Sequence, residues 1–538
     1  MPVAAAMARV ETGSRVRCRA RKHRACNAYS EARLRRMAQT PWGDSSVPGP
    51  IRPGNGHRSG QRMASANLLG FARAVACGVR RRITMLAQVV RGLGLAVLLA
   101  NLLATEGVAA ERPNVLFLLA DDLRADTLGA LGHPIVQTPN LDQLARRGVI
   151  FRNAYCLGGN SPAVCLPSRN MLLSGRAYFR WQGPYAPADR PNFPTSMKDA
   201  GYVAYHHGKR GNVAVEIQKR FDENHILQDE KERTSGQPGK TVIDGALDFL
   251  HRRDASKPFF MYLAFEAPHD PRVAAPEFRK PYEARETPLP RNFLPLHPFD
   301  NGEMTVRDEK LAAWPRTEAE IRQHLRDYHA VITGLDYHIG RLLRRLDDLD
   351  LSKNTLIIFS SDNGLAIGSH GLMGKQSLYD HSMKVPLLFA GPGVPRGESS
   401  ALVYLHDLYP TVLEMIGATI PQGLDGQSFA REFTRDQAKG GTRRESLFLA
   451  YRDEQRAVRD ARWKLIRYPK LNKSQLFDLS NDPDEMHDLA ANPAHAAEME
   501  RLMELMKDWQ RQLGDATPLS TEKPRRERFV PPETLPKK

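Results

Sequence analysis

A cysteine stands four residues before an arginine in the stretch AVCLPSRNMLLSG, residues 163–175. Cys165 could be a structural thiol, half of a disulfide or a reacting group. The chain has five cysteines, and only Cys156 and Cys165 follow residue 110, so a disulfide framework is excluded by number. One bridge between these two is the plainest alternative in an exported protein. The residues around Cys165 must decide between the readings.

Two pairs of oxygen-bearing side chains follow apolar runs directly. Asp121 and Asp122 follow NVLFLLA, and Asp362 and Asn363 close the stretch TLIIFSSDN. An isolated Asp-Asp pair is more often a helix cap or a solvated turn, but two such pairs behind two strands favour a shared site. Three carboxylates and one amide oxygen suit Ca²⁺ or Mg²⁺, and not zinc.

Cations and one histidine complete a possible reaction centre. Arg169 follows Cys165, Lys209 lies in HHGKRGN, and Lys375 lies in GSHGLMGKQSLYDHS. Each could be an ordinary surface residue. Together with a divalent metal they would hold a tetrahedral sulfate or phosphate anion. His269 could be a core histidine, but FEAPHDP reads as a tight polar turn that presents an imidazole as a general acid or base.

Apolar runs alternate with helical patterns in the first two thirds of the chain. Runs at 114–120, 258–265, 355–364 and 385–393 predict strands, and 139–148, 167–175 and 321–349 predict helices. This alternation predicts an α/β fold with a large, mostly parallel sheet sandwiched by helices. Ligands gather beyond the carboxyl ends of such strands, where Asp121, Asp122, His269, Asp362 and Asn363 would lie. The Pro-rich stretch 271–320 predicts a long ordered loop over these ends.

The pattern changes after about residue 435. SLFLAYR, QRAVRDARWKLIRY and SQLFDLSNDP predict short strands of a smaller antiparallel sheet, and 494–514 is amphipathic and predicts a terminal helix. We therefore expect a catalytic domain over 111–435, a C-terminal subdomain over 436–514 and a flexible tail over 515–538.

The formal net charge of +16 is concentrated near the N-terminus. Residues 1–84 hold 17 Lys and Arg against 3 Asp and Glu, which leaves about +2 for the rest, so we infer no nucleic-acid partner. Basic residues 80–82, the apolar run 93–104 and VAA at 108–110 predict a signal peptide within 85–110, and the run is too short for a stable membrane span. Residues 1–84 would then be disordered or an over-extended start, and the mature protein secreted or periplasmic.

CLPSR matches the C-x-P-S-R signature of type I sulfatases, within the alkaline-phosphatase-like superfamily. The resemblance runs from about residue 113 to residue 514. It includes ADDLRADTLGALG, KPFFMYLAFEAPHDPR, SSDNG and HGLMGKQSLYDHSMKVPLLFAGPG. ADDLR and APHDP most resemble the iduronate-2-sulfatase and choline-sulfatase branches. The sequence is thus similar to enzymes that hydrolyse sulfuric esters.

The resemblance implies that Cys165 is oxidised to Cα-formylglycine by a formylglycine-generating enzyme during export. Its hydrate would attack sulfur and displace the alcohol, and its second hydroxyl would then let sulfate leave. The family roles fall on these positions: Asp121, Asp122, Asp362 and Asn363 bind Ca²⁺, with Mg²⁺ as the alternative, together with the modified Cys165; Arg169 and Lys209 steady the formylglycine; His269 and Lys375 contact the sulfate.

One departure from the family pattern concerns the base that expels sulfate. The family usually has a histidine two or three residues after the lysine that matches Lys209, where this chain has Gly211 and Asn212. His206, His207 or His269 could substitute. A phosphoester or phosphonate-monoester hydrolase of the same superfamily, and an inactive glycan-binding protein, are the competing hypotheses. The expected substrate is a sulfated carbohydrate or another sulfate ester.

Overall fold

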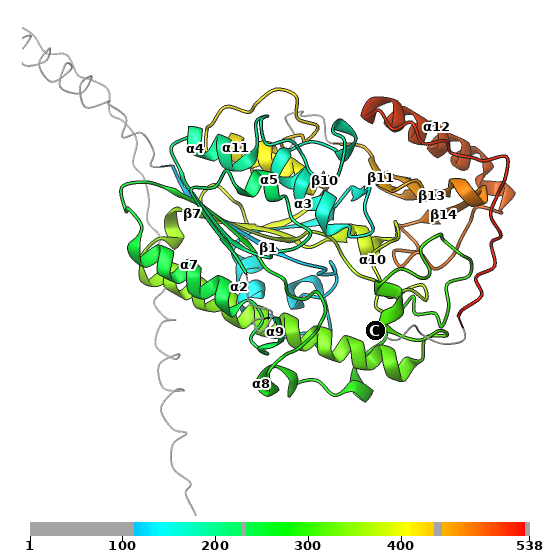
Figure 1. Cartoon of the computed structure of the whole chain (residues 1–538), viewed down its shortest axis with the longest axis horizontal. Coiled ribbons are helices and arrows are strands. Elements are labelled where there is room, and N and C mark those ends of the chain that lie inside the picture. Colours follow the sequence, from blue (N-terminus) through cyan, green and yellow to red (C-terminus); the bar gives the residue numbers. More distant parts are fainter. Residues whose placement is uncertain (1–111, 228–232, 435–443, 533–538) are drawn as a thin grey trace, which may run out of the picture. The chain divides into compact units, whose positions relative to one another are not determined.

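The computed structural model describes residues 112–227, 233–434 and 444–532 (Figure 1). These residues belong to one compact unit. The expected basic upstream segment and signal peptide lie outside the described residues. In the described part of the chain, no helix is long and apolar enough to cross a membrane.

The large sheet has the strand order β10-β2-β9-β7-β1-β6-β4-β5, with β8 beside β2. Its strands are β1 (Asn114–Ala120), β2 (Val149–Tyr155), β4 (Val203–Gly208), β5 (Glu223–Ile226), β6 (Phe259–Ala264), β7 (Thr355–Ser361), β8 (Lys384–Val385), β9 (Leu387–Ala390) and β10 (Gly397–Tyr404). β7, β1, β6, β4 and β5 run parallel, which confirms a mostly parallel sheet. The strand expected at 385–393 forms as β9 but runs antiparallel to both β7 and β2.

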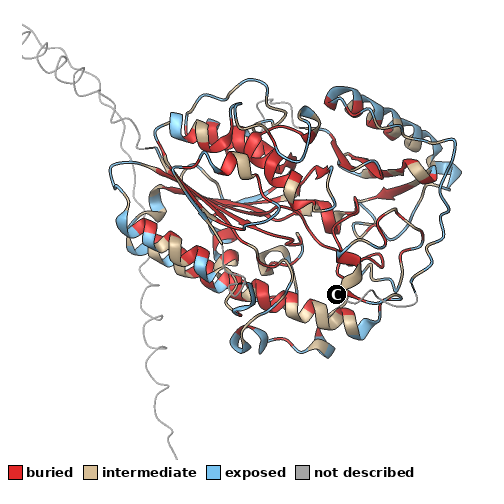
Figure 2. Cartoon of the chain, viewed as in Figure 1, coloured by how far each residue is buried: buried red, intermediate tan, exposed pale blue. Residues whose placement is uncertain are grey.

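Strand β1 is buried throughout, and apolar after Asn114, because both faces of the sheet are covered by helices. Val115, Phe117 and Leu119 belong to one core, and the alternating Leu116, Leu118 and Ala120 to the other. The helices of the first face are α3 (Cys165–Ser174), α4 (Phe193–Asp199), α5 (Val215–Gln218) and α11 (Leu408–Met415); those of the second are α2 (Pro139–Arg147), α7 (Lys240–Arg252) and α9 (Glu318–Asp348). Figure 1 shows the two groups on opposite sides of the sheet, and Figure 2 shows the buried sheet between them.

Helix α9 confirms the amphipathic pattern, because its buried Leu325, Ile332, Leu335 and Ile339 recur at helical spacing. Helix α3 differs from the expected 167–175: it begins at Cys165, two residues before Pro167. Nine of its ten residues are buried, so it has no solvent-facing stripe from which its start could be read. Cys165 is thus the first residue of a core helix.

The smaller sheet follows the predicted pattern. β11 (Leu447–Tyr451), β12 (Gln455–Arg459), β13 (Trp463–Tyr468) and β14 (Lys473–Asp478) pair antiparallel in sequence order. A fifth strand, β3 (Gly158–Gly159), pairs parallel with β11 and comes from the segment just before Cys165. Gly158 has φ 105°, and a Cβ there would lie 2.2 Å from the carbonyl oxygen of Ala450. Helix α12 (Ala496–Leu513) closes the chain's regular structure.

Two irregular segments lie on this framework. The Pro-rich stretch contains only short helical pieces, including α8 (Pro276–Arg279), and its Asn292 carbonyl accepts a 2.7 Å hydrogen bond from the backbone of His370. This agrees with an ordered loop over the strand ends. Residues 515–532, expected as part of a flexible tail, contact the body. Asp515 forms a buried ion pair with Arg456 at 2.6 Å, and the Arg525 backbone donates to Lys470 at 2.8 Å.

Candidate functional site

Four adjacent parallel strands deliver the predicted site residues to one edge of the sheet. β7 ends before Asp362, β1 before Asp121, β6 five residues before His269, and β4 directly before Lys209. Cys165 and Arg169 come from the first turns of α3, and Lys375 comes from the loop between β7 and α10 (Asp380–Met383). All nine predicted site residues occur in this region, where hydrogen bonds, ion pairs and contacts to sulfur join them into one cluster.

The oxygen-bearing residues form the centre of the cluster. The Asp122 backbone donates to Asp362 Oδ1 at 3.2 Å, and Asn363 Nδ2 donates to Asp122 Oδ1 at 2.7 Å. Asp122 takes a left-handed backbone conformation, with φ 65°. One ligand atom each from Asp121, Cys165 and Asp362 lies within 4.8 Å of the others. The carboxylates therefore converge on the side chain of Cys165.

The donor set fits a hard divalent cation. Asp121 Oδ1 and Asn363 Oδ1 are buried, and neither has a hydrogen-bond partner within the described residues. A buried polar atom without a partner is costly, and a bound cation would satisfy both oxygens. Because the set contains carboxylate and amide oxygens, it suits Ca²⁺ or Mg²⁺.

Arg169 ties two of these carboxylates together. Its Nε donates to Asp362 Oδ2 at 2.8 Å and its Nη2 to Asp121 Oδ2 at 2.9 Å, with all three side chains fully buried. Charge-assisted bonds of this kind offset the cost of burying the guanidinium. Its Nη1 has no partner among the described residues. This leaves one donor of Arg169 available for a ligand.

Two lysines flank the sulfur of Cys165. Lys209 Nζ and Lys375 Nζ each lie 3.8 Å from Sγ. Lys209 also pairs with Asp121, and Lys375 with Asp122 at 2.7 Å. Burial lowers the pKa of both ammonium groups, but the neighbouring carboxylates outweigh it and leave each pKa above its ordinary value. Both lysines are thus cations beside the reacting position.

The thiol of Cys165 itself is a poor nucleophile in this setting. Burial raises its pKa to about 11, against the lowering effect of the two lysines, so it is protonated at neutral pH. Cys156 and Cys165 are both free, and Cys156 contacts Met383 instead. The disulfide alternative is therefore wrong. A cationic, carboxylate-lined position holding an unreactive thiol fits a side chain that acts in another chemical form.

The two carboxylates on Arg169 differ in acidity. Burial raises the pKa of Asp121, but Lys209 and Arg169 outweigh it, and the pKa falls well below its usual range. The pKa of Asp362 rises to about 6 because of burial and the nearby charge of Asp121. Without a further cation, the site therefore holds one firmly ionised carboxylate and one that ionises near neutrality.

His269 lies at the open side of the cluster. Its Nδ1 is 2.7 Å from the carbonyl oxygen of Asp270, and its Nε2 is 3.7 Å from Asp122 Oδ2. Because a carbonyl only accepts, Nδ1 carries the hydrogen, and Nε2 can take up or release a proton. The side chain is 16 % exposed, whereas Arg169 and both Asp121 and Asp362 are fully buried.

The other two candidate histidines do not reach the cluster. Both nitrogens of His206 are engaged, by Asn224 at 2.7 Å and Gln218 at 3.2 Å, and burial lowers its pKa to about 3. His207 packs closely against Gly245 of α7. A Cβ atom added to this glycine would lie only 2.4 Å from Nδ1 of His207. Among the described residues, His269 is thus the histidine that contacts the carboxylate cluster.

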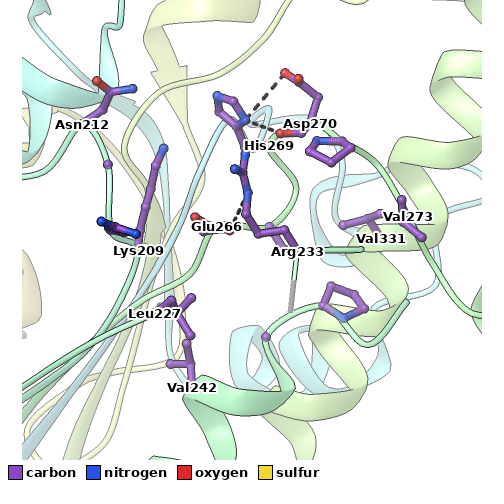
Figure 3. Close-up of a pocket in the computed structure, with 16 residues that line it drawn as sticks. Lys209, Asn212, Leu227, Arg233, Val242, Glu266, His269, Asp270, Val273 and Val331 are labelled. Atoms are coloured by element: carbon purple, nitrogen blue, oxygen red, sulfur yellow. Dashed lines mark hydrogen bonds and ion pairs between the residues drawn. The ribbon is translucent and has the colours of Figure 1, made fainter. Parts of the chain in front are cut away.

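A cavity of about 540 Å³ opens beside Lys209 and His269 (Figure 3). Leu227, Val242 and Val331 supply apolar lining. Its polar lining includes Asn212 and Arg233, whose Nε lies 3.1 Å from Glu266. Open space surrounds Gly211, where an added Cβ would meet no atom within 4 Å. The positions that lack the expected histidine therefore border open space.

Sequence reasoning missed four charged residues near the site. Arg233 and Glu266 line the cavity, and Arg307 pairs with Asp270, the neighbour of His269. Asp270 lay inside the FEAPHDP motif and could have been singled out. Arg233 and Arg307 stand outside the strands and long helices that the pattern predicted, so nothing in the sequence distinguished them from surface arginines.

Comparison with known proteins agrees with this geometry. The sulfatase family matches residues 113–418, more than half of the chain, and the C-terminal family of N-sulphoglucosamine sulphohydrolase matches residues 368–512. The chain belongs to the sulfatase family. The enzyme class that follows is sulfuric ester hydrolase.

Individual relatives of this sulfatase are distant but extensive. It is 25 % identical over 498 residues to the N-acetylglucosamine-6-O-sulfatase of Bacteroides thetaiotaomicron, covering 76 % of this chain and 88 % of the relative. A protein solved with D-glucosamine-2-N,6-O-disulfate shares the fold with a TM-score of 0.65, at 24 % identity over 76 % of this chain and 99 % of that one. The phosphonate monoester hydrolase of Agrobacterium radiobacter has a TM-score of 0.64, at 21 % identity over 75 % of this chain and 96 % of that one.

Proposed function

We propose that this sulfatase is an exported enzyme that releases sulfate from a sulfated carbohydrate, with Cys165 matured to Cα-formylglycine and Ca²⁺ held beside it. The observation that carries the proposal is the position of Lys209 and Lys375, each with Nζ 3.8 Å from the sulfur of the buried Cys165, beside carboxylates that Arg169 binds. Maturation requires a formylglycine-generating enzyme as a partner during export. Localisation outside the cytoplasm rests on the predicted signal peptide.

Asp121, Asp122, Asp362 and Asn363 would hold the ion, which supplies a Lewis acid for the sulfate oxygens and for the nucleophile. The matured residue supplies a hydrated aldehyde in place of the thiol. Lys209 would bind the side chain at position 165 directly, and Arg169 would orient the two carboxylates beside it. Lys375, also 3.8 Å from the Cys165 sulfur, offers its ammonium to the negative charge that grows on the ester as it reacts.

His269 is the proposed acid for the departing alcohol. A sugar alkoxide is a poor leaving group, so protonation of its oxygen contributes strongly to the rate. Nδ1 of His269 is fixed by the Asp270 carbonyl, and Nε2 faces the carboxylate cluster, 3.7 Å from Asp122 Oδ2. Because no other histidine contacts the cluster in the described structure, His269 would also accept the proton when sulfate is expelled.

Replacing His269 by Asn should lower kcat for a sulfated monosaccharide by roughly 10²- to 10⁴-fold. The leaving group of 4-nitrophenyl sulfate needs no proton. For this substrate, the rate of the first step, in which the phenol leaves, should therefore fall much less. The check is kcat and kcat/KM for both substrates in the wild type and the variant, with His225→Asn as a control on the exposed edge strand β5. Because kcat/KM reports the first step and kcat includes the expulsion of sulfate, an equal loss of kcat/KM on both substrates would argue against a leaving-group role.

The cavity is the proposed seat of the sugar. Its apolar lining suits the faces of a pyranose ring, and Arg233 offers a cation beside His269 (Figure 3). One relative is named as an N-acetylglucosamine-6-O-sulfatase and another as an ulvan-active sulfatase. These features support a carbohydrate substrate over a small alkyl sulfate.

Replacing Arg233 by Gln should raise KM about tenfold for a sugar with a second sulfate or a carboxylate, because one charge-assisted contact is lost. KM for a neutral monosulfated sugar should change little. Arg252→Gln is a matched control, since Arg252 also pairs with a glutamate, Glu223, on the surface. Steady-state kinetics on the two sugars would check this, and equal shifts on both would contradict it.

The phosphonate-hydrolase alternative is tested by paired assays on aryl sulfate, aryl phosphate and phenyl phosphonate. We expect turnover of the sulfate to dominate, and much faster turnover of either phosphorus ester would overturn the proposal. Lack of turnover on all three and on a panel of sulfated sugars, with an unmodified thiol at Cys165, would favour the inactive glycan-binding alternative.

A further inference from the structure

Three consecutive charged residues of the Pro-rich loop contact both loops that carry the groups proposed to hold sulfate. They are Arg307, Asp308 and Glu309, the last two in a 3₁₀ turn at Asp308–Leu311. We propose that this triplet, here called the 307–309 clamp, positions His269 and Lys375 relative to each other and to Cys165. The inference rests on the roles proposed for these residues and adds positioning residues to them.

Arg307 holds the His269 loop. Its Nη1 donates to Asp270 Oδ1 at 2.7 Å, and its Nη2 pairs with Asp270 Oδ2, so both ends of the carboxylate are fixed. Asp270 in turn contacts His269 Nδ1 through its backbone carbonyl at 2.7 Å and its carboxylate at 3.6 Å. The orientation of the imidazole is therefore coupled to Arg307 through one intervening residue.

Asp308 connects the same arginine to the Lys375 loop. Its Oδ1 accepts from Arg307 Nη1 at 2.9 Å, and its Oδ2 accepts from Gln376 Nε2 at 2.8 Å. Gln376 Oε1 accepts from the backbone N–H of Lys375 at 2.9 Å, and Nε2 also donates to the carbonyl of Pro162, three residues before Cys165. One glutamine thus joins the Lys375 loop, the clamp and the approach to Cys165.

Glu309 fixes the backbone just before Lys375. Its carboxylate accepts from the N–H groups of Met373 at 3.0 Å and Gly374 at 2.8 Å, and it pairs with the buried Arg316 at 2.6 Å. The approach is close, because a Cβ on Gly374 would lie 3.0 Å from Asp308 Cβ. The backbone that leads into Lys375 therefore rests directly on the clamp.

Because Arg307 is largely exposed, its effect on turnover can be distinguished from its effect on folding stability. Its side chain is 59 % exposed, so its ion pair with Asp270 should contribute little to folding. Geometry is more demanding, because a catalytic group displaced by about 1 Å can lose 10²-fold in rate. Loss of Arg307 should therefore affect turnover far more than folding. Within the described residues, the hydrogen bonds and ion pairs of Arg307 go to Asp270 and Asp308, so it acts on the site through them.

The experiment compares Arg307→Met and Asp308→Asn with the wild type, all produced as the full chain together with a formylglycine-generating enzyme. We expect kcat for a sulfated monosaccharide to fall roughly 10- to 100-fold, with KM changed less than about threefold. The fall for 4-nitrophenyl sulfate should be smaller in Arg307→Met, because Arg307 acts through the proposed acid. Arg307→Lys should recover part of the loss.

The matched control is Arg462→Met. Arg462 binds Asp478 through two bonds of 3.0 and 2.7 Å on the smaller sheet, with side-chain exposures of 55 % and 8 %, close to the 59 % and 12 % of Arg307 and Asp270. A loss in Arg307→Met no larger than in this control, an equal loss on both substrates, or a failure of Arg307→Met to fold would overturn the inference. His269→Asn and Lys375→Ala are measured alongside; if they retain full activity, the proposed function fails first and independently.

Discussion

Replacing Cys165 by Ser is expected to lower turnover by on the order of 10⁵-fold, the scale of losing a nucleophile outright. A serine hydroxyl can attack sulfur and take up SO₃ as the alcohol leaves. It then lacks the second hydroxyl whose deprotonation would re-form an aldehyde and expel sulfate. Because Lys209 and Lys375 both lie 3.8 Å from this position, the charged adduct would also be held in place. Intact-protein mass spectrometry after incubation with substrate should find a stable sulfated form.

Cys156→Ser is the matched control, since Cys156 is equally buried but contacts Met383 away from the cations. It should retain turnover near that of the wild type. The peptide that contains Cys165 should carry an aldehyde in active wild-type preparations. A preparation that turns over fully while Cys165 remains a thiol would show that the proposed nucleophile is wrong.

The sequence was sufficient to place the carboxylates because they follow strands with both faces buried. Residues 115–120 of β1 and 356–359 of β7 are apolar without interruption, so both strands could be read from hydropathy, and parallel neighbours bring their carboxyl ends to one edge. The direction of β9 could not be read in this way. An apolar run of four residues has the same pattern whether it runs parallel or antiparallel, and only pairing with β7 and β2 decides it.

The histidine question shows what pattern alone cannot resolve. His206 and His207 stand three and two residues before Lys209 and alternate across β4, so their side chains point to opposite faces of the sheet. His206 binds Asn224 and Gln218, and His207 packs towards α7, so neither contacts the cluster. The 307–309 clamp lies in a stretch without hydrophobic periodicity. In such a stretch, the sequence predicts only that charged side chains are exposed to solvent. Its role depends on which distant loops pack on it, information that is set by tertiary contacts and not by local sequence.

Removing the proposed divalent cation by chelation is expected to lower turnover by roughly 10³-fold or more, because the charge that would stabilise the reacting ester is lost. It should also make stability depend more steeply on pH. Asp121 and Asp362 are both buried on Arg169, and the pKa of Asp362 is about 6 in the metal-free protein against 3.8 when unfolded. A folded-state pKa above the unfolded value means that protonation of Asp362 favours the fold, so its contribution is lost as pH rises through about 6.

The melting temperature of the chelated enzyme should therefore fall between pH 5 and 7 relative to the calcium-loaded enzyme, in which the cation balances both carboxylates. Asp336 provides an internal control, because burial raises its pKa to about 6 as well and it binds the N-terminus of α2 instead of the site. Titration of Asp336 should change the melting temperature equally in the chelated and the calcium-loaded enzyme. It therefore cancels in the difference between the two melting temperatures. Asp362→Asn should remove the pH dependence of that difference and lose the response to added Ca²⁺. If the loaded and chelated curves stay parallel from pH 5 to 7, Asp362 does not face a cation in the folded protein, and the ligand set must be reassigned.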